Sequence, residues 1–371
     1  MPSDATRPPN LSGPISAQIR RLDRALVVPP APGRPNRAVQ RSGVLDDAGR
    51  PVAEAMTWRG MSPVTVAPAP PEGPVDELAG RWLFLGPLFG HFGHFLVESI
   101  SRLWALDALR GEIDGVLYVP KFQHRVQHVA ETYRPFLGAL GVDVPMHSLE
   151  RPTRVERLCV PVQGFGMFEM IEGAPEFRDY MRRHAGRDVA PKGAHKIYIS
   201  RSALPAGRGS ILGEARLEAW LEADGYEVFH PQKHDYLTQI AAYKAATHVV
   251  AVDCSPLHLL ALVGHAEQKV GIIARRPGGL GELFARQIRA FTGADGVAVD
   301  ALQRNWIEQT AQRPDRTSWG EVDYAAIGAV MTQSGLVTSS ADWTPLDATE
   351  VQSEIARLAP STRSGLKAFE G

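Results

Sequence analysis

Short apolar segments alternate with amphipathic stretches through the second half of the chain. Four of these segments run at 195–200 (HKIYIS), 226–231 (YEVFHP), 248–253 (HVVAVD) and 269–274 (KVGIIA). Between the first two, Leu217, Trp220 and Leu221 recur at the i, i+3, i+4 spacing of one apolar helix face. Nearly continuous apolar strands that alternate with helices are typical of a parallel sheet covered on both faces. The pattern therefore predicts an α/β lobe in this half.

The first half is interrupted more often by proline and glycine, with PPAPGRP at 29–35 and APAPPEGP at 67–74. Such clusters predict extended connections between short strands. A buried strand is predicted at 82–86 (WLFLG), a long helix from about His91, and a further strand at 115–120 (GVLYVP). This strand, helix, strand order predicts a second α/β lobe.

The division of the chain into lobes follows from these patterns. Residues 151–194 mix glycine, proline and charged side chains and are expected to connect the lobes. We expect an N-terminal lobe over 1–170, a C-terminal lobe over 171–340, and within 341–371 a helix that can return to the first lobe. In open parallel sheets, ligands bind at the carboxyl ends of the strands, so functional motifs are expected there.

Composition narrows the class of protein. The chain has 371 residues, of which 44% are hydrophobic, so it can bury two moderate cores and is not disordered as a whole. The 40 Lys and Arg residues against 41 Asp and Glu give a net charge of -1, which does not favour binding to nucleic acid. The two cysteines, Cys159 and Cys254, show no disulfide or zinc pattern.

The location of the protein is expected to be cytoplasmic. The N-terminus lacks the basic-then-apolar order of a signal peptide, and no apolar run approaches the ~20 residues of a membrane-spanning helix. A peripheral contact with the inner membrane stays open, and Arg20, Arg21 and Arg24 form one weak candidate patch for it.

The first polar motif lies on the predicted helix after the 82–86 strand. His91, His94, Glu98 and Arg102 are spaced i, i+3, i+7 and i+11, so a regular helix would place all four on one narrow strip. A solvated face with a Glu98–Arg102 ion pair is the plainer alternative. Two histidines and a carboxylate also make a conceivable metal ligand set, although the spacing fits no established metal motif. We favour a functional strip, because two histidines beside one carboxylate are unusual on a solvated face.

The second motif follows the strand at 195–200. Arg201 leaves the strand end, and Arg208 lies between Gly207 and Gly209. Two guanidinium groups in a glycine-rich loop suit a phosphate, because arginine stays charged and binds phosphate through two hydrogen bonds. A solvated surface loop is an equally weighted alternative.

The third motif, DCSPLH at 253–258, follows the strand at 248–253. Ser255 and Pro256 are typical of the N-cap and the first position of a helix, whose free N–H groups favour an anion. Asp253, Ser255 and His258 do not indicate a hydrolase, because no G-x-S-x-G turn surrounds the serine. Cys254 is expected to be a small core thiol rather than a nucleophile.

In chain order these segments resemble glycosyltransferase family 61. The similarity lies in HFLVE at 94–98 with Arg102 and Leu103, in YISRS at 198–202, and in the downstream residues Arg208, Ile211, Leu212, Glu214 and Gly225. It covers roughly residues 81–275. Family members usually carry H-G-A-G-L-T-N where this chain has Asp253 to Leu259, and this departure bears on how a donor phosphate approaches that helix.

The resemblance implies an α/β fold of the GT-B type, with two Rossmann-like doubly wound lobes facing a central cleft. It implies an inverting transfer of a sugar from a nucleotide-sugar donor to a glycan or lipid-linked acceptor in surface polysaccharide synthesis. The chain contains no Asp-x-Asp sequence, so no metal and no other cofactor is expected. The oligomeric state is not predicted.

The motifs and the resemblance together predict a role for each candidate residue. Glu98, or His94 in its place, is the candidate catalytic base. The candidate donor-binding residues are Ser200, Arg201, Arg208, Asp253, Ser255 and His258. The candidate supporting residues are His91, Arg102 and Glu214. Two alternatives stay open: a GT-B sugar-nucleotide epimerase, and a non-catalytic protein that binds a nucleotide or glycan.

Overall fold

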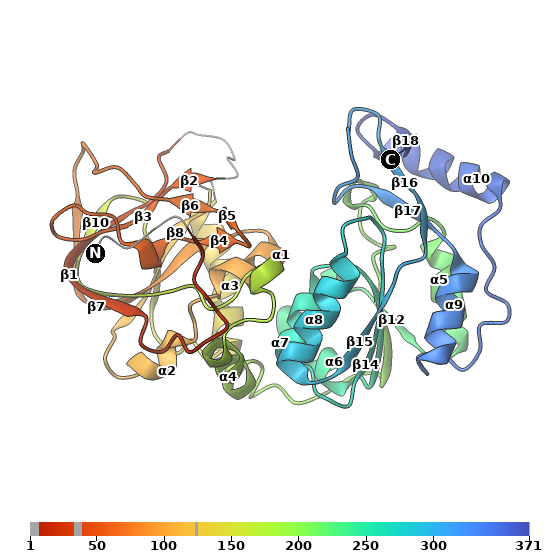
Figure 1. Ribbon diagram of the computed structural model, residues 1–371, viewed down its shortest axis with the longest axis horizontal. Helices are drawn as coiled ribbons and strands as arrows, with labels where there is room; N and C mark the ends of the chain where they lie inside the picture. The colour runs from red at the N-terminus through yellow and green to blue at the C-terminus, as the bar shows by residue number, and fades with distance from the viewer. Residues whose placement is uncertain (1–6, 33–38, 123–124, 371) are drawn as a thin grey trace. The chain divides into compact units, whose positions relative to one another are not determined.

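The computed structural model describes residues 7–32, 39–122 and 125–370. Contacts between residues divide the chain into two compact units, Met1–Asp188 and Val189–Gly371, and each is described by itself. Both units combine helices with a sheet that contains parallel strands, which confirms the predicted mixed α/β class (Figure 1).

The first unit is built on a six-stranded sheet with the order β3-β1-β10-β7-β8-β9. The strands are β1 (Ile19–Val28), β3 (Gly43–Leu45), β7 (Asp76–Leu88), β8 (Gly115–Pro120), β9 (Met146–Ser148) and β10 (Thr153–Pro161). Strands β10, β7, β8 and β9 run parallel, whereas β1 is antiparallel to both β10 and β3. The sheet is therefore mixed, whereas the resemblance implies a Rossmann-like doubly wound lobe.

Strand β10 corrects the prediction that residues 151–194 only connect two lobes. It lies inside the sheet, between β1 and β7. Its sequence, TRVERLCVP, mixes apolar and polar residues, and its charged residues, Arg154, Glu156 and Arg157, are partly or fully exposed. A half-exposed strand of this kind lacks the continuous apolar run by which the other strands were predicted.

Smaller elements surround this sheet. The short strands are β2 (Gln40–Arg41), β4 (Trp58–Arg59), β5 (Ser62–Pro63) and β6 (Thr65–Val66). The helices are α1 (Phe92–His94), α2 (Ala105–Leu109), α3 (Val126–Ala139) and α4 (Pro175–His184), with 3-10 turns η1 (Ala53–Ala55) and η3 (Phe168–Met170). Strands β4 and β5 form a hairpin that becomes important for the site.

The predicted long helix from His91 is broken. Helix α1 passes directly into a π-helical turn, η2 (Phe95–Ser99), in which Ile100 N–H donates to the Phe95 carbonyl five residues earlier. The Ser99 hydroxyl donates to the Pro87 carbonyl and accepts from Phe89 N–H, which ties this turn to the end of β7. Such π-helical turns are frequent at functional sites.

The second unit contains a fully parallel sheet with the order β12-β11-β13-β14-β15. The strands are β11 (Lys196–Ile199), β12 (Glu227–Phe229), β13 (His248–Val252), β14 (Lys269–Ile273) and β15 (Asp295–Val299). The four predicted strands are confirmed, and β15 adds a fifth. The helices are α5 (Glu214–Ala223), α6 (Tyr236–Ala245), α7 (Pro256–Val263), α8 (Leu280–Thr292) and α9 (Tyr324–Gln333), with 3-10 turns η4 (Ala206–Arg208) and η5 (Pro231–Lys233).

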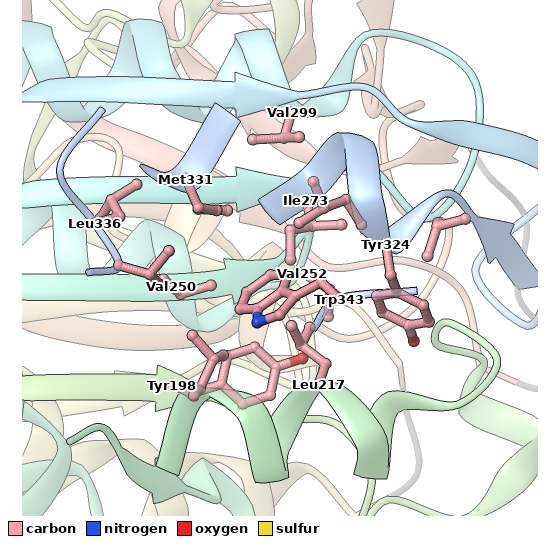
Figure 2. Packing of buried hydrophobic residues seen from close by; sticks show 14 of the residues in the cluster. Tyr198, Leu217, Val250, Val252, Ile273, Val299, Tyr324, Met331, Leu336 and Trp343 are labelled. Atoms are coloured by element: carbon pink, nitrogen blue, oxygen red, sulfur yellow. The ribbon is translucent and has the colours of Figure 1, made fainter. Parts of the chain in front are cut away.

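The core of the second unit lies between this sheet and helices α5 and α9. Figure 2 shows Tyr198 and Val250 from the strands packed near Trp343, and Leu217 from α5 beside them. Trp220 stacks on the Trp343 ring at a centroid distance of 5.3 Å. The apolar helix face predicted around Leu217 is therefore confirmed.

The C-terminal region adds a small sheet and a helix to the second unit. Strands β16 (Leu302–Glu308), β17 (Trp319–Val322) and β18 (Leu366–Phe369) form the sheet. Helix α10 (Ala348–Leu358) and the 3-10 turn η6 (Ala359–Ser361) lie between β17 and β18 in the chain. Val351 and Leu358 of α10 pack with Trp306 and Trp319 in one apolar cluster. The apolar face of this helix is thus buried within the second unit.

No helix among the described residues is both long enough and apolar enough to pass through a membrane. In the candidate membrane patch on β1, the Arg21 guanidinium donates to Glu112 at 2.6 Å. Arg24 lies 3.9 Å from the carboxylates of Asp47 and Glu77. Carboxylates therefore offset two of the three arginines, and a membrane contact at this patch stays a prediction.

Candidate active site

A buried carboxylate at the end of β7 is the centre of the candidate site in the first unit. Glu98 lies in the π-helical turn η2, and its side chain is 0% exposed. Its Oε1 accepts a hydrogen bond of 2.6 Å from Nε of Arg59, and its Oε2 lies 3.1 Å from Nδ1 of His94. Arg59 Nη2 is also 3.1 Å from the same imidazole nitrogen. We call Arg59, His94 and Glu98 the Glu98 cluster.

The charge state of Glu98 follows from two opposed effects. Burial raises the pKa of a carboxyl, but the hydrogen bonds and positive charge of His94 and Arg59 outweigh burial and hold the pKa of Glu98 below its usual value. Glu98 is therefore an anion at neutral pH. It is enclosed and already paired, whereas the His94 side chain is 37% exposed. Of the two candidate bases, His94 is the one that solvent reaches.

The sequence could not reveal Arg59. This residue lies on β4, one of the short strands in the β4–β5 hairpin, and precedes Glu98 by 39 residues. No helical spacing joins the two positions. A buried carboxylate requires a cationic or hydrogen-bonding partner, so the sequence could predict that Glu98 has one. It could not predict which residue that partner is.

The surroundings of His94 are aromatic and cationic. Its ring lies 5.4 Å from the Phe89 ring and 5.1 Å from the His91 ring, measured between centroids. The Lys121 ammonium lies over Phe89 at 5.4 Å from the ring centroid. Burial lowers the pKa of Lys121 to about 8, although the charge of Glu98 opposes this effect. His94 thus faces a region with more positive than negative groups.

Arg102 does not share a strip with the other three polar residues. It is 0% exposed, and its guanidinium donates to the carbonyls of Pro161, Glu54 and Met56. The predicted single strip is therefore wrong, because the helix ends in the π-helical turn before Arg102 is reached. Burial lowers the pKa of Arg102 to about 9. Arg102 ties β10 to the segment that leads into Arg59, and the plainer Glu98–Arg102 ion pair does not form.

In the second unit, residues of the YISRS motif form a network of hydrogen bonds around Glu214. The Glu214 Oε1 atom accepts from the Tyr198 hydroxyl at 2.9 Å and from Arg201 N–H at 2.7 Å, and its Oε2 accepts from the Ser210 hydroxyl at 2.5 Å. Burial raises the pKa of Glu214, and the hydrogen bonds only partly oppose this. The Ser200 hydroxyl donates to Glu218 at 2.5 Å. The motif therefore fixes the loop that leaves β11.

Arg201 and Arg208 do not form a simple pair of guanidinium groups. Arg201 Nε and Nη2 donate to the Gly209 carbonyl, and Nη2 also donates to the Arg208 carbonyl at 2.6 Å. Arg201 is half-buried, while the Arg208 side chain is exposed. Burial, together with the nearby charge of Arg275, lowers the pKa of Arg201. Arg201 thus shapes the loop that carries Arg208.

Asp253 forms a buried ion pair that sequence reasoning missed. Its Oδ1 lies 2.8 Å from Nε of Arg275, with side-chain exposures of 1% and 4%, and 3.8 Å from Nε of Arg276. Burial raises the pKa of Asp253 despite these arginines. A signal was present in the sequence, because Arg275 follows the β14 strand just as Arg201 follows β11. Three arginines therefore lie at the carboxyl ends of the parallel strands.

The DCSPLH segment begins α7 as predicted, with Ser255 at the N-cap position and Pro256 at the first helical position. The Ser255 side chain makes no capping hydrogen bond, because its backbone is already helical (φ -57°, ψ -33°). His258 is buried, with Nδ1 2.7 Å from Gln287 Oε1. Cys254 is a buried thiol whose pKa burial raises to about 12, as expected of a core cysteine.

A metal site would require several ligating side chains close together. Among residues 7–32, 39–122 and 125–370, no three His, Cys, Asp or Glu side chains are placed so that they could hold one metal ion.

Comparison with known proteins adds a family match. The family model described as Glycosyltransferase 61 matches residues 92–271, a range that contains His94, Glu98 and the YISRS motif. No curated protein matches the sequence.

Two solved structures of TibC show weak structural similarity. One is described as the dodecameric iron-containing heptosyltransferase in complex with ADP-D-beta-D-heptose; it has 11% identity, a TM-score of 0.31, and coverage of 76% of this chain and 82% of that chain. The other, described as a bacterial iron-containing dodecameric glycosyltransferase from enterotoxigenic E. coli H10407, has 12% identity, a TM-score of 0.30, and coverage of 74% and 80%. Similarity at this level carries no inference about the present chain.

Proposed function

The chain belongs to glycosyltransferase family 61, and on that premise we propose that it moves a sugar from a nucleotide-sugar donor to a hydroxyl group of a glycan or lipid-linked acceptor. It is thus a transferase, and the proposal concerns its substrates and mechanism. The observation that supports the mechanism best is the Glu98 cluster, in which an enclosed carboxylate, paired with Arg59, lies 3.1 Å from one nitrogen of a partly exposed histidine.

In the proposed step, His94 is the general base. The step requires the His94 tautomer with its proton on Nδ1, which lies 3.1 Å from Glu98 Oε2; Arg59 Nη2, 3.1 Å from the same nitrogen, must then turn away from it. The Nε2 lone pair can then accept the proton of the acceptor hydroxyl. The acceptor oxygen forms a bond to the anomeric carbon of the donor sugar as the bond to the diphosphate oxygen breaks. The diphosphate leaves with the bonding electrons, and Glu98 stabilises the imidazolium that forms. Glu98 is then a positioning residue.

Inversion of the anomeric carbon follows from a single displacement. A double displacement would need a carboxylate free to attack the sugar, and Glu98 is enclosed and paired with Arg59. This property is our proposal and rests on the family as well as on the geometry of Glu98.

We propose that the donor binds at the carboxyl ends of the parallel strands in the second unit, where ligands of such sheets usually lie. Arg201, Arg208 and Arg276 would offset the charge of the departing diphosphate, and Ser255 would offer the start of α7. Ser200, Asp253 and His258 are held by Glu218, Arg275 and Gln287, so their proposed part is to position this edge of the sheet. Glu214 has the same supporting part through its contact with Arg201.

The remaining features of the enzyme are part of this proposal. The first unit would bind the acceptor and the second the donor, in a GT-B arrangement of two lobes around a cleft. Transfer would need no metal, in keeping with the lack of an Asp-x-Asp sequence. We further propose a cytoplasmic enzyme of surface polysaccharide synthesis that contacts the inner membrane at its periphery.

The test is a transfer assay with a panel of UDP-, GDP-, CMP- and ADP-linked sugars and a mixture of glycan and lipid-linked acceptors, with magnesium or with EDTA. We expect one nucleotide to be released together with a glycosylated product whose new bond has the inverted anomeric configuration by NMR, in either medium. Arg201→Ala is expected to slow release.

Three results would contradict the proposal. Release of a free sugar epimer without an acceptor would indicate an epimerase. Nucleotide binding without turnover across the panel would indicate a binding protein. Loss of activity in EDTA that magnesium restores would refute metal independence.

A further inference from the structure

The first unit contains a pocket of about 310 Å³ that the mechanism does not yet use. It lies where β7, β8 and β9 end and α3 begins, and its walls include Leu88, Pro120, Ser148 and Val129. This volume is at the lower end of the ~300–1,000 Å³ range of small-molecule sites, so it suits one sugar residue better than an oligosaccharide.

The pocket adjoins the proposed base. His91 lines the pocket, and its ring lies 5.1 Å from the ring of His94 between centroids. A sugar in the pocket would therefore have His91 beside it and His94 one ring further on. The pocket thus neighbours the Glu98 cluster through the His91 ring.

The charge of the lining has one sign. Its titratable side chains are His91, Arg125 and His128, and the lining contains no carboxylate among the described residues. Arg125 and His128 are exposed at the start of α3. The apolar wall, with Leu88 and Val129, can pack against the C–H groups of a sugar ring, while the Arg125 guanidinium favours an anionic substituent.

The wall of the pocket also contains a buried polar atom that makes no hydrogen bond to the described residues. The Ser148 hydroxyl oxygen is buried in the wall and has no hydrogen-bond partner among the residues that the structure describes. A buried hydroxyl without a partner costs free energy, and a bound sugar hydroxyl would satisfy it. This observation indicates a polar ligand rather than a purely apolar one.

We propose that this pocket binds an acceptor sugar that carries an anionic group, either the carboxylate of a uronic acid or a phosphate. The anion lies against Arg125 and His128, the ring packs on Val129, and a hydroxyl of the same sugar or of its neighbour points to His94. The inference rests on the proposed function, because it assigns the acceptor of that reaction.

The test is direct binding, measured by titration calorimetry, of methyl β-glucuronide, glucose 6-phosphate and neutral methyl β-glucoside. We expect the anionic sugars to bind at least about tenfold more tightly than the neutral one, because charge-assisted hydrogen bonds are the stronger ones. Arg125→Gln should abolish this difference, and Val129→Trp should block all three sugars. Arg134→Gln is the matched control, since Arg134 is exposed on α3 but does not line the pocket.

The outcomes separate the two anions and the two proposals. Preference for the glucuronide alone identifies a carboxylate, and equal binding of both anions identifies charge as the feature recognised. Equal binding of anionic and neutral sugars, or an unchanged preference in Arg125→Gln, overturns the inference. Arg125 is exposed, so this variant is expected to fold. Because these measurements need no donor, nucleotide release in the transfer assay tests the proposed function separately.

Discussion

Removal of Arg59 is expected to destabilise the first unit alone. Arg59→Met keeps much of the side chain's length but leaves Glu98, which is 0% exposed, with only His94 beside it. Breaking a buried ion pair on one side typically costs about 3–5 kcal/mol. Arg59 is 33% exposed, and His94 still offsets the charge, so we expect about 2 kcal/mol.

The same substitution is expected to change how the stability of the first unit depends on pH. In the wild type, the pKa of Glu98 is lowered on folding, so its contribution to stability is present above the unfolded pKa of about 4.3 and is lost as the pH falls through the folded value. In Arg59→Met, burial is opposed only by His94, and the pKa of Glu98 rises. The variant should therefore lose less stability than the wild type between pH 6 and pH 3.

Methionine oxidation in urea can follow each unit separately. Met146 on β9 and Met331 on α9 are buried in the first and second units, respectively, and peroxide oxidises them only after unfolding. With a slope of about 1–3 kcal/mol per molar urea, a loss of about 2 kcal/mol lowers the Met146 midpoint by about 1 M. The Met331 midpoint should not move.

A matched surface variant provides the control. Arg81 on β7 pairs with Asp114 at 3.5 Å, and both side chains are more than 40% exposed (44% and 49%). Arg81→Met should change the Met146 midpoint little, because exposed pairs are worth about 0–1 kcal/mol. Arg59→Met would then be compared with Arg81→Met. If it too keeps the wild-type Met146 midpoint in urea, and loses as much stability in acid as the wild type, then Arg59 does not stabilise the Glu98 carboxylate.

Two further predictions concern the second unit. Asp253→Asn leaves Arg275 buried without its anion and should lower the Met331 oxidation midpoint in urea, at a cost of about 3 kcal/mol; an unchanged midpoint would contradict the buried pair. The Cys254 thiol, with its pKa raised to about 12, should react with iodoacetamide at pH 8 at least about tenfold more slowly than the half-buried Cys159, as peptide mass spectrometry can show; comparable rates would contradict its burial.

The sequence predicted the second unit better than the first for a physical reason. Strands such as β13 and β14 are covered on both faces, so burial requires a continuous apolar run that is visible without coordinates. Strand β10 carries polar residues to the surface, and its pairing with β1 joins distant positions, from Val27 with Thr153 to Ile19 with Pro161. Long-range pairing of this kind leaves no local pattern.

The candidate site divides in the same way. The pair of His94 and Glu98 could be predicted because four residues of helical chain bring the two side chains together. Their partner Arg59 could not, since a two-residue strand supplies it from elsewhere in the sequence. The predicted position of Arg102 failed because the π-helical turn interrupts the regular spacing on which the prediction relied. The YISRS motif could be recognised in the sequence. Its hydrogen bonds to Glu214 could not be predicted, because they depend on how the chain folds.

The most direct measurement is the rate of nucleotide release by His94→Gln, with the donor and acceptor that the wild type uses. We predict a loss of about 100- to 10,000-fold, the usual contribution of a general base, with the affinity for the nucleotide unchanged. The control is His147→Gln, because His147 is exposed on β9 and lies against Trp82 rather than Glu98; it should keep the wild-type rate. A wild-type rate in His94→Gln would contradict the assignment of His94 as the base.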